Sequence, residues 1–264
     1  MRLLDSQDYF SAVLPVYAQI QVPQTRAKGW EALKELSKDQ RYNPLVWMIS
    51  DVIKARQAGI LKHVEVIVYG PPGAGKTTYV VNSLLWIFED PKEVLKRMIF
   101  DMDGMTEFVR NVVNGVEYDV AVFDDPTAVG LSSSYTLKGT KEKQRIANII
   151  DAFTYIKDYV GVVIYTVPRL VGLAKFIRDI AEWKVKVKKD GKIIFTRSEI
   201  VSTRSGLLKE VDVPHMFYFQ YETKMPDEIW KAMMERRKKV VADRLLRALE
   251  GENGEVTESD AGDE

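Results

Sequence analysis

The sequence has 264 residues, 46% of them hydrophobic, which is enough to bury the core of one main domain with an appendage. It has no cysteine, which excludes disulfides and thiolate metal sites, and no role is assigned to its two histidines. Residues 250–264 hold seven carboxylates and no Lys or Arg, so the remaining 38 basic and 31 acidic side chains give residues 1–249 a net charge of +7. This basic body suits an anionic ligand or partner.

Residues 1–60 are expected to form a helical extension without visible chemistry. Apolar residues recur at helical spacing over residues 5–20, and Pro23 can open a second helix. Asn43 and Pro44 form an N-cap and first-turn pair for a third helix. The N-terminus lacks the pattern of a signal peptide, and no stretch is long and apolar enough for a bilayer. We therefore expect a soluble protein in the cytoplasm of a host cell.

Residues 61–181 are expected to form an α/β core. Apolar strand candidates alternate with amphipathic helix candidates, and this alternation predicts a mostly parallel sheet covered by helices on both faces. The predicted strands are 64–70, 98–101, 119–125 and 161–166, and the predicted helices are 79–88, 106–115, 141–158 and 170–181.

The pairing is predicted to become antiparallel in residues 182–249. Asp190-Gly191 lies between two strand candidates and indicates a β-hairpin, after which a strand-rich stretch continues to residue 221. Pro226 then opens a basic helix. Residues 250–264 are expected to form a disordered acidic tail.

The segment from Gly70 to Thr78 fits the phosphate-loop pattern G-x-x-x-x-G-K-[ST] in full. Its glycines let backbone N–H groups converge on phosphate oxygens, and the following helix presents its positive end to the same anion. Lys76 is expected to reach the β- and γ-phosphates, and the Thr77 hydroxyl to bind Mg²⁺. A chance match is disfavoured because the motif lies between a buried strand and an amphipathic helix. The predicted loop comprises Gly70, Pro71, Pro72, Gly73, Ala74, Gly75, Lys76, Thr77 and Thr78.

Two acids end the predicted strand 119–125. Phosphate-loop enzymes use an acid at the end of such a strand to place a group near Mg²⁺. We expect Asp124 to hold the metal through its water shell and Asp125 to orient or deprotonate the attacking water. Many such ATPases use Glu at the second position, so the shorter Asp125 leaves weak hydrolysis open. The simpler interpretation is a strand that runs into an acidic turn.

Thr166 ends the predicted strand 161–166. If this strand lies between the loop strand and the Asp124 strand, Thr166 faces the γ-phosphate and can sense it or hold the attacking water. Otherwise Thr166 only caps a strand. Arg169 and Arg178 follow, and either one suits an arginine finger for a neighbouring subunit, although most arginines are surface residues.

Lys184, Lys186 and Lys188 alternate with valines, so they share one face of the predicted hairpin. Such a ladder can contact the phosphate backbone of a nucleic acid, as can the basic residues 236–239 of the last helix. It is equally typical of an exposed hairpin on which lysines discourage edge pairing. Both interpretations stay open.

Five sequence blocks follow one another: YGPPGAGKTTY, VFDDP, GVVIYTVP with Arg178 after nine further residues, WKVKVKKDG and MPDEIWKAMMERRKKV. Their order resembles the DnaA-like AAA+-type phosphate-loop ATPases of spindle-shaped archaeal viruses (fuselloviruses) and related plasmids. The likeness covers residues 64–245, and residues 1–60 depart from the family. It implies an AAA+-like fold with an extra strand between the strands that carry the loop and the acid. It also gives Thr166 and Arg178 added weight as site residues.

The sequence therefore predicts an ATPase that uses ATP and Mg²⁺, with Lys76, Asp125, Thr166 and Arg178 as its catalytic residues. The resemblance implies work on viral or plasmid DNA in replication initiation or helicase loading, as a homo-oligomer with a helicase or other replication protein as partner. A DNA packaging or translocating ATPase and a nucleotide-gated adaptor with weak hydrolysis are the alternatives. No base-reading motif separates ATP from GTP.

Overall fold

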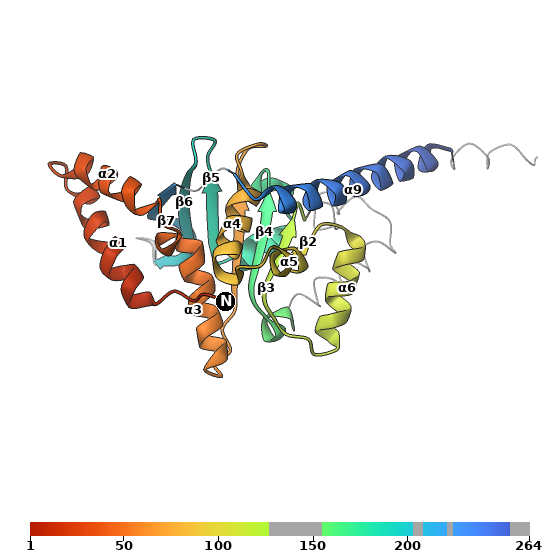
Figure 1. The fold of residues 1–264 in the computed structure, drawn as a ribbon, viewed down its shortest axis with the longest axis horizontal. Helices are drawn as coiled ribbons and strands as arrows, with labels where there is room; N and C mark the ends of the chain where they lie inside the picture. Colours follow the sequence, from red (N-terminus) through yellow and green to blue (C-terminus); the bar gives the residue numbers. More distant parts are fainter. Residues whose placement is uncertain (127–154, 203–207, 221–223, 254–264) are drawn as a thin grey trace, which may run out of the picture. The chain divides into compact units, whose positions relative to one another are not determined.

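The computed structural model of the chain describes residues 1–126, 155–202, 208–220 and 224–253 (Figure 1). The chain divides into two compact units, Met1–Met225 and Pro226–Glu264. Most of the predicted helix 141–158 and most of the predicted tail lie outside the described residues. The division into four segments stays a prediction.

One seven-stranded sheet forms the centre of the first unit. Its strands are β1 (Val64–Tyr69), β2 (Met98–Ile99), β3 (Tyr118–Asp124), β4 (Val160–Val167), β5 (Trp183–Val187), β6 (Lys192–Ser202) and β7 (Leu208–Gln220). The spatial order is β2-β3-β4-β1-β5-β6-β7. The first five strands pair in parallel, and β4 lies between β1 and β3. The predicted α/β class with a mostly parallel sheet is confirmed, including the strand inserted between the loop strand and the acid strand.

The pairing differs from the sequence prediction at β5. The hairpin signal predicted antiparallel pairing from this strand onward, but β5 pairs in parallel with β1, and antiparallel pairing begins at β6. The predicted turn does join β5 to β6, with Gly191 at a φ of 79° and the Asp190 carboxylate accepting from the Lys192 N–H at 3.2 Å. A turn specifies only the two strands that it connects, so it carries no information about the other neighbour of β5.

Helices cover both faces of the sheet. On one face, Phe123 and Tyr165 pack in a core cluster with Phe108 and Ile177, which belong to two covering helices. On the other face lie the helices that flank β1 in the sequence (Figure 1). The helices are α1 (Ser6–Gln21), α2 (Arg26–Leu36), α3 (Pro44–Gln57), α4 (Lys76–Phe88), α5 (Pro91–Lys96), α6 (Met102–Val113), α8 (Lys175–Ile180) and, in the second unit, α9 (Asp227–Asn253), with 3-10 turns η1 (Gln40–Tyr42) and η3 (Leu170–Gly172).

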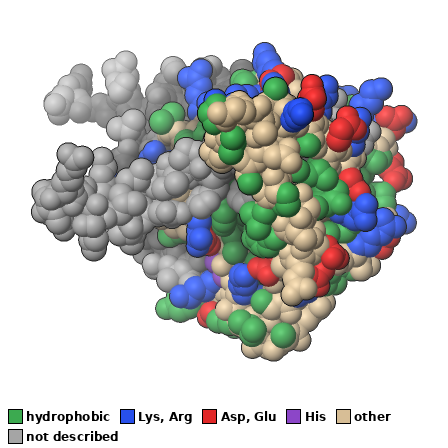
Figure 2. Space-filling view, turned by 90° about the vertical axis from the view of Figure 1, so that its left-hand side faces the viewer, with side chains coloured by type: hydrophobic (Ala, Val, Ile, Leu, Met, Phe, Trp, Pro, Cys, Tyr) green, Lys and Arg blue, Asp and Glu red, His purple; other side chains and the backbone are tan. Residues whose placement is uncertain are grey.

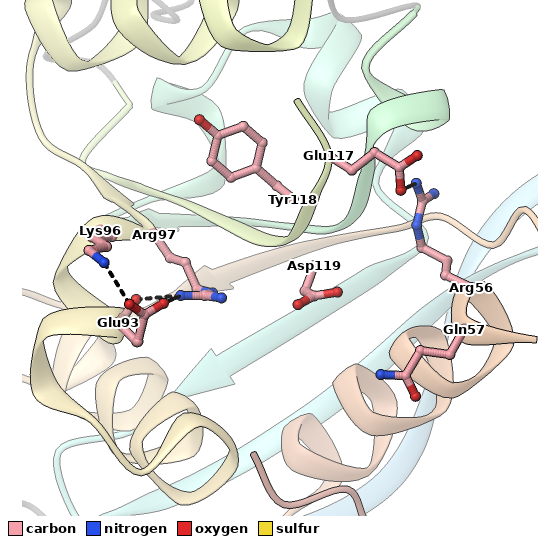
Figure 3. A pocket seen from close by; sticks show the side chains of 8 residues that line it. All are labelled: Arg56, Gln57, Glu93, Lys96, Arg97, Glu117, Tyr118 and Asp119. Atoms are coloured by element: carbon pink, nitrogen blue, oxygen red, sulfur yellow. Dashed lines mark hydrogen bonds and ion pairs between the residues drawn. The ribbon is translucent and has the colours of Figure 1, made fainter. Parts of the chain in front are cut away.

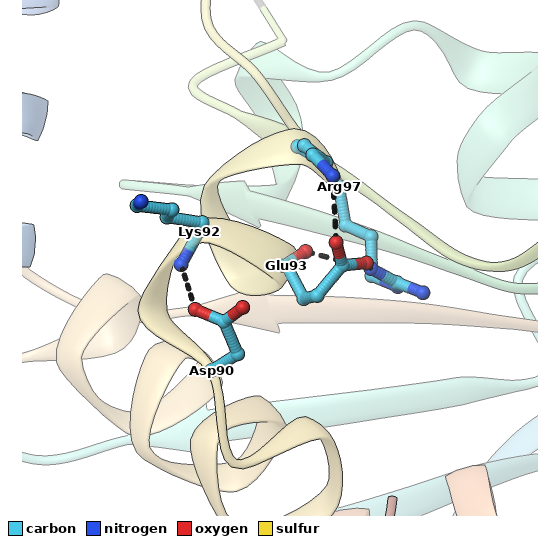
Figure 4. Close-up of polar contacts among 5 residues, drawn as sticks. Asp90, Lys92, Glu93 and Arg97 are labelled. Carbon is cyan, nitrogen blue, oxygen red and sulfur yellow. Dashed lines mark hydrogen bonds and ion pairs between the residues drawn. The ribbon is translucent and has the colours of Figure 1, made fainter.

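Helix ends follow local capping signals. Asn43 caps α3 as predicted, accepting from the Leu45 N–H at 3.0 Å. Pro23 does not open α2, which begins three residues later after a turn. The short helix α5 was not predicted, although Asp90 caps it by accepting from the Lys92 N–H at 2.8 Å and Pro91 takes its first position (Figure 4).

The predicted helix 170–181 is interrupted. Its residues form η3 and then α8, with Leu173 in extended backbone between them. Leu173 is fully buried in the same core cluster as Ile177. Burying this side chain therefore takes precedence over helical continuity.

The outer surface of the first unit carries charges of both signs. Figure 2 shows the side on which α1 and α2 lie, where basic and acidic side chains are interspersed among neutral ones. Among the described residues, no helix is both long and apolar enough to cross a membrane.

Candidate nucleotide-binding site

The predicted phosphate loop connects the end of β1 to the start of α4. Gly73 and Gly75 have φ angles of 73° and 84°, in the left-handed region that favours glycine. Gly75 is the N-cap of α4, so the loop ends where the helix begins. The first N–H groups of a helix have no partner within the helix and carry partial positive charge, which is the arrangement that phosphate oxygens bind.

Gly70 permits a close approach between the loop and β5. A Cβ atom at this position would lie 2.2 Å from the carbonyl oxygen of Val187. We expect Gly70→Ala to lower the free energy of unfolding by about 1–3 kcal/mol, because backbone has to move to admit the methyl group. Denaturant unfolding measures this loss. Gly172→Ala is the control, since a Cβ there meets nothing within 4 Å, and equal stability of the two variants would contradict the prediction.

Lys76 is folded over the loop that precedes it. Its Nζ donates to the carbonyl oxygens of Gly70 at 2.9 Å and Pro71 at 3.2 Å. Both acceptors belong to the loop, so the ammonium group lies beside the backbone that is predicted to hold the phosphates. The side chain is half-buried, which strengthens its interaction with an anion relative to bulk water.

Asp124 brings three elements together. Its Oδ1 accepts from the Thr77 hydroxyl at 2.8 Å and from the Thr166 hydroxyl at 2.6 Å. Asp124 and Thr166 are register partners on β3 and β4, and Thr77 comes from the first turn of α4. Asp124 is 4% exposed and Thr166 is 2% exposed, so both are buried at the carboxyl ends of their strands, whereas Thr77 is half-buried.

The donor set of this cluster fits Mg²⁺. A carboxylate and a hydroxyl are hard oxygen ligands, and Mg²⁺ in phosphate sites takes only one or two protein oxygens besides phosphate and water. Within the described part of the chain, no group of three or more His, Cys, Asp or Glu side chains forms a separate metal site. The cluster of Thr77, Asp124 and Thr166 therefore suits a metal that is shared with a nucleotide.

Asp125 lies just beyond the end of β3 and is exposed. Its φ of 55° is in the left-handed region, which Asp tolerates better than most non-glycine residues. The Asp125 N–H donates to the Thr166 carbonyl at 3.1 Å and lies 3.4 Å from the Thr166 hydroxyl. These contacts hold the turn, so that an exposed carboxylate follows directly after the buried Asp124.

No protein-family model and no curated protein matches the sequence. Among solved structures, the chain is similar to the genome packaging NTPase B204 from Sulfolobus turreted icosahedral virus 2 (10% identity, TM-score 0.34, 58% of this chain and 98% of that one). It is also similar to the pCW3 conjugation coupling protein TcpA (12%, 0.35, 66% of each chain) and to the N-terminal domain of zonular occludens toxin from Neisseria meningitidis (12%, 0.34, 64% and 98%).

Similarities at this level carry no functional argument. The fold class rests on the strand order, with β4 inserted between β1 and β3, and on the loop that joins β1 to α4. The fold is an α/β fold in which a mostly parallel sheet carries the loop between β1 and α4. Its additional strands, β6 and β7, extend the sheet beyond β5.

The two candidate arginines differ in environment. Arg169 is exposed and precedes η3. Arg178 lies in α8, and its Nε is buried without a hydrogen-bond partner among the described residues. Neither side chain forms a hydrogen bond or ion pair with the loop or with Asp124 in the described part of the chain. The structure thus does not join the arginines to the cluster that Asp124 organises.

Two residues of the predicted lysine ladder, Lys184 and Lys186, lie on the internal strand β5, and Lys188 directly follows its end. Lys184 and Lys186 alternate with Val185, which is fully buried, and lie in register with Ile67 and Tyr69 of β1. Lys186 is exposed, whereas Lys184 and Lys188 are half-buried. Because β5 pairs with both β1 and β6, protection of a sheet edge does not explain these lysines.

A cleft of about 410 Å³ lies at the amino-terminal end of β3, and Asp119 is among the residues that line it (Figure 3). Asp124 lies at the other end of this strand. Its cations are paired: Lys96 and Arg97 contact Glu93, and Arg56 contacts Glu117. The Lys96 ammonium, followed by the Arg97 guanidinium, lowers the pKa of Glu93 to about 2. No sequence motif indicated this cleft. It is lined by Arg56, Gln57, Glu93, Lys96, Arg97, Glu117, Tyr118 and Asp119.

Proposed function

We propose that this chain is an Mg²⁺-dependent ATPase that forms a homo-oligomer and acts on viral or plasmid DNA, in replication initiation or helicase loading. The observation that carries the proposal is the contact of both Thr77 and Thr166 with Asp124. It supplies metal-binding oxygens beside a phosphate loop. The DNA part is supported by the resemblance of the five sequence blocks to DnaA-like ATPases of fuselloviruses and related plasmids.

In this proposal each residue has a distinct role in hydrolysis. The loop N–H groups and Lys76 bind the β- and γ-phosphates, and Thr77 and Asp124 hold Mg²⁺. Bound Mg²⁺ supplies positive charge to the phosphate oxygens. Asp125 accepts a proton from the water whose oxygen attacks the γ-phosphorus, while the bond from that phosphorus to ADP breaks. Thr166 orients the same water or the γ-phosphate.

A nucleotide-gated adaptor is the second candidate, and the identity of Asp125 favours it. An Asp carboxylate reaches one methylene less far than Glu, so the attacking water is held less closely. Such a protein binds ATP and turns it over slowly. Its partner, rather than DNA, then responds to the bound nucleotide.

Two measurements on the full chain test the proposal. The first is the rate of phosphate release from ATP with and without single- and double-stranded DNA, and the second is the solution mass with and without ATP. Stimulation by DNA alone in a nucleotide-dependent ring indicates a packaging or translocating motor. Stimulation that needs an added helicase indicates a loader, and tight ATP binding with negligible turnover indicates an adaptor. Failure to bind ATP contradicts all three functions.

We expect reversal of Lys184, Lys186 and Lys188 to Glu to weaken DNA binding and flatten its salt dependence. The slope of log K against log salt is negative, and each lost phosphate contact on duplex DNA reduces its magnitude by about 0.9. The magnitude should therefore decrease by roughly 3 units. Fluorescence anisotropy over a salt series measures both quantities. The matched control reverses Lys28, Lys34 and Lys38, which are exposed in or beside α2. If affinity and slope survive the first reversal, β5 does not contact DNA.

A further inference from the structure

The helix that follows the phosphate loop is hydrogen-bonded to the N-terminal extension at its first turns. Tyr79 lies two residues after Thr77 in α4, and its hydroxyl donates to Asn43 Oδ1 at 2.7 Å. Asn43 Nδ2 donates to the Ser83 hydroxyl at 2.8 Å, and that hydroxyl donates to the Tyr79 carbonyl at 2.8 Å. We call Asn43, Tyr79 and Ser83 the Asn43 cluster.

Asn43 uses every hydrogen-bonding position of its side chain. Besides the contacts to α4, its Oδ1 accepts from the Leu45 N–H at 3.0 Å and its Nδ2 donates to Gln40 Oε1 at 2.8 Å. All three residues of the Asn43 cluster are fully buried. Burial makes an unpaired member costly, so the cluster tolerates little movement of α4 relative to α3. A single side chain therefore caps α3 and fixes the start of α4.

The other end of α4 is also held by the extension. The Arg2 N–H donates to the Ile87 carbonyl at 2.7 Å, which satisfies a carbonyl that the helix itself leaves unpaired. Glu89, the C-cap of α4, contacts Arg2 Nε at 2.7 Å and the N-terminal amino group at 3.4 Å. These ion pairs are exposed and contribute little individually. The buried Asn43 cluster is the stronger of the two attachments.

We propose that Asn43 and Tyr79 are positioning residues of the nucleotide site, through which the N-terminal extension sets the place of Lys76 and Thr77. The inference rests on the proposed function. Lys76, Thr77 and Tyr79 lie in the first turn of one helix, so a shift of the Tyr79 ring moves the phosphate-binding groups with it. Groups that bind a ligand lose much of their effect when displaced by about 1 Å. The extension thereby acquires a role that its sequence alone did not indicate.

Tyr79→Phe tests this inference because it removes one hydroxyl and leaves the Leu45 N–H bond of Asn43 in place. In a titration of the full chain with ATP and Mg²⁺, well below the melting temperature, we expect the affinity to fall roughly 3- to 10-fold, the range set by one buried hydrogen bond. Far-UV circular dichroism establishes that every variant is fully folded, so that the affinity reports the geometry of the site.

Tyr9→Phe is the matched control. Tyr9 belongs to the extension and is fully buried, but its hydroxyl has no hydrogen-bond partner in the described part of the chain. We expect its ATP affinity to equal that of the wild type. Should Tyr79→Phe fail to fold, Ser83→Ala removes the second contact of Asn43 with α4 and is expected to weaken ATP binding about threefold.

Two outcomes separate the inference from the function on which it rests. If the wild type binds ATP and Tyr79→Phe (or its substitute Ser83→Ala) binds it equally well, the positioning role is wrong and the proposed function stands. If the wild type does not bind ATP, both are wrong. A loss of affinity in the cluster variants, with none in Tyr9→Phe, supports the positioning role.

Discussion

Replacing Lys76 by alanine is expected to weaken ATP binding by roughly 100-fold or more, because hydrogen bonds from a charged donor to an anion contribute about 1.5–3 kcal/mol each. The Lys76 ammonium lies beside the carbonyls of Gly70 and Pro71, within the loop. The substitution removes this charge and leaves the backbone N–H groups in place. Isothermal titration of the full chain with ATP and Mg²⁺ measures the change.

The control for this experiment is Lys189→Ala. Lys189 is an exposed lysine of the turn between β5 and β6, so its loss changes the net charge equally without touching the loop. Its ATP affinity is expected to match that of the wild type. If Lys76→Ala retains an affinity within about threefold of the wild type, the assignment of the phosphate loop is wrong.

Asp125→Asn is expected to leave ATP bound while lowering turnover by about 10²- to 10⁴-fold, the usual contribution of a general base. The amide cannot accept a proton from the attacking water. Asn tolerates the left-handed backbone at least as well as Asp, so the φ of 55° and the contacts to Thr166 should be preserved. Single-turnover hydrolysis and nucleotide retention on a filter measure the two effects separately.

Asp119→Asn makes the same chemical change near the opposite end of β3. Asp119 lies near the amino-terminal end of β3, in the wall of the cleft, whereas Asp125 follows the carboxyl-terminal end. We expect Asp119→Asn to hydrolyse ATP at the wild-type rate. An unchanged rate in Asp125→Asn would remove that carboxylate from the mechanism.

Features of the fold that depend on neighbouring residues were predictable. Asn43 and Pro44 set the start of α3 through one hydrogen bond and one fixed φ angle, and Asp190-Gly191 set the turn after β5. The break in the predicted helix at Leu173 was not predictable in this way, because the local sequence favours a helix and the burial of Leu173 in the core interrupts it. The parallel pairing of β5 with β1 was not predictable either, since no local sequence signal specifies which strand lies beside β5 on the side opposite β6.

In the candidate site, too, features set by residues adjacent in sequence were predictable, and contacts between distant residues were not. The phosphate loop and Asp124 follow from contiguous motifs, whereas the contact of Asp124 with Thr166 requires β4 to lie beside β3. The residues alone left that arrangement as a condition and the family resemblance implied it, and the strand order meets it. The bond between Asn43 and Tyr79 joins residues 36 positions apart, and neither position carries a motif that names the other. Such contacts become visible only when the chain is folded.

Steady-state release of phosphate from ATP by the full wild-type chain, with Mg²⁺ and with a chelator in its place, tests the central claim most directly. We predict turnover that requires Mg²⁺ and is lost in both Lys76→Ala and Asp125→Asn. Equal turnover by the wild type and the two variants would contradict an active site built on the phosphate loop and Asp125, as would wild-type turnover that persists in the chelator.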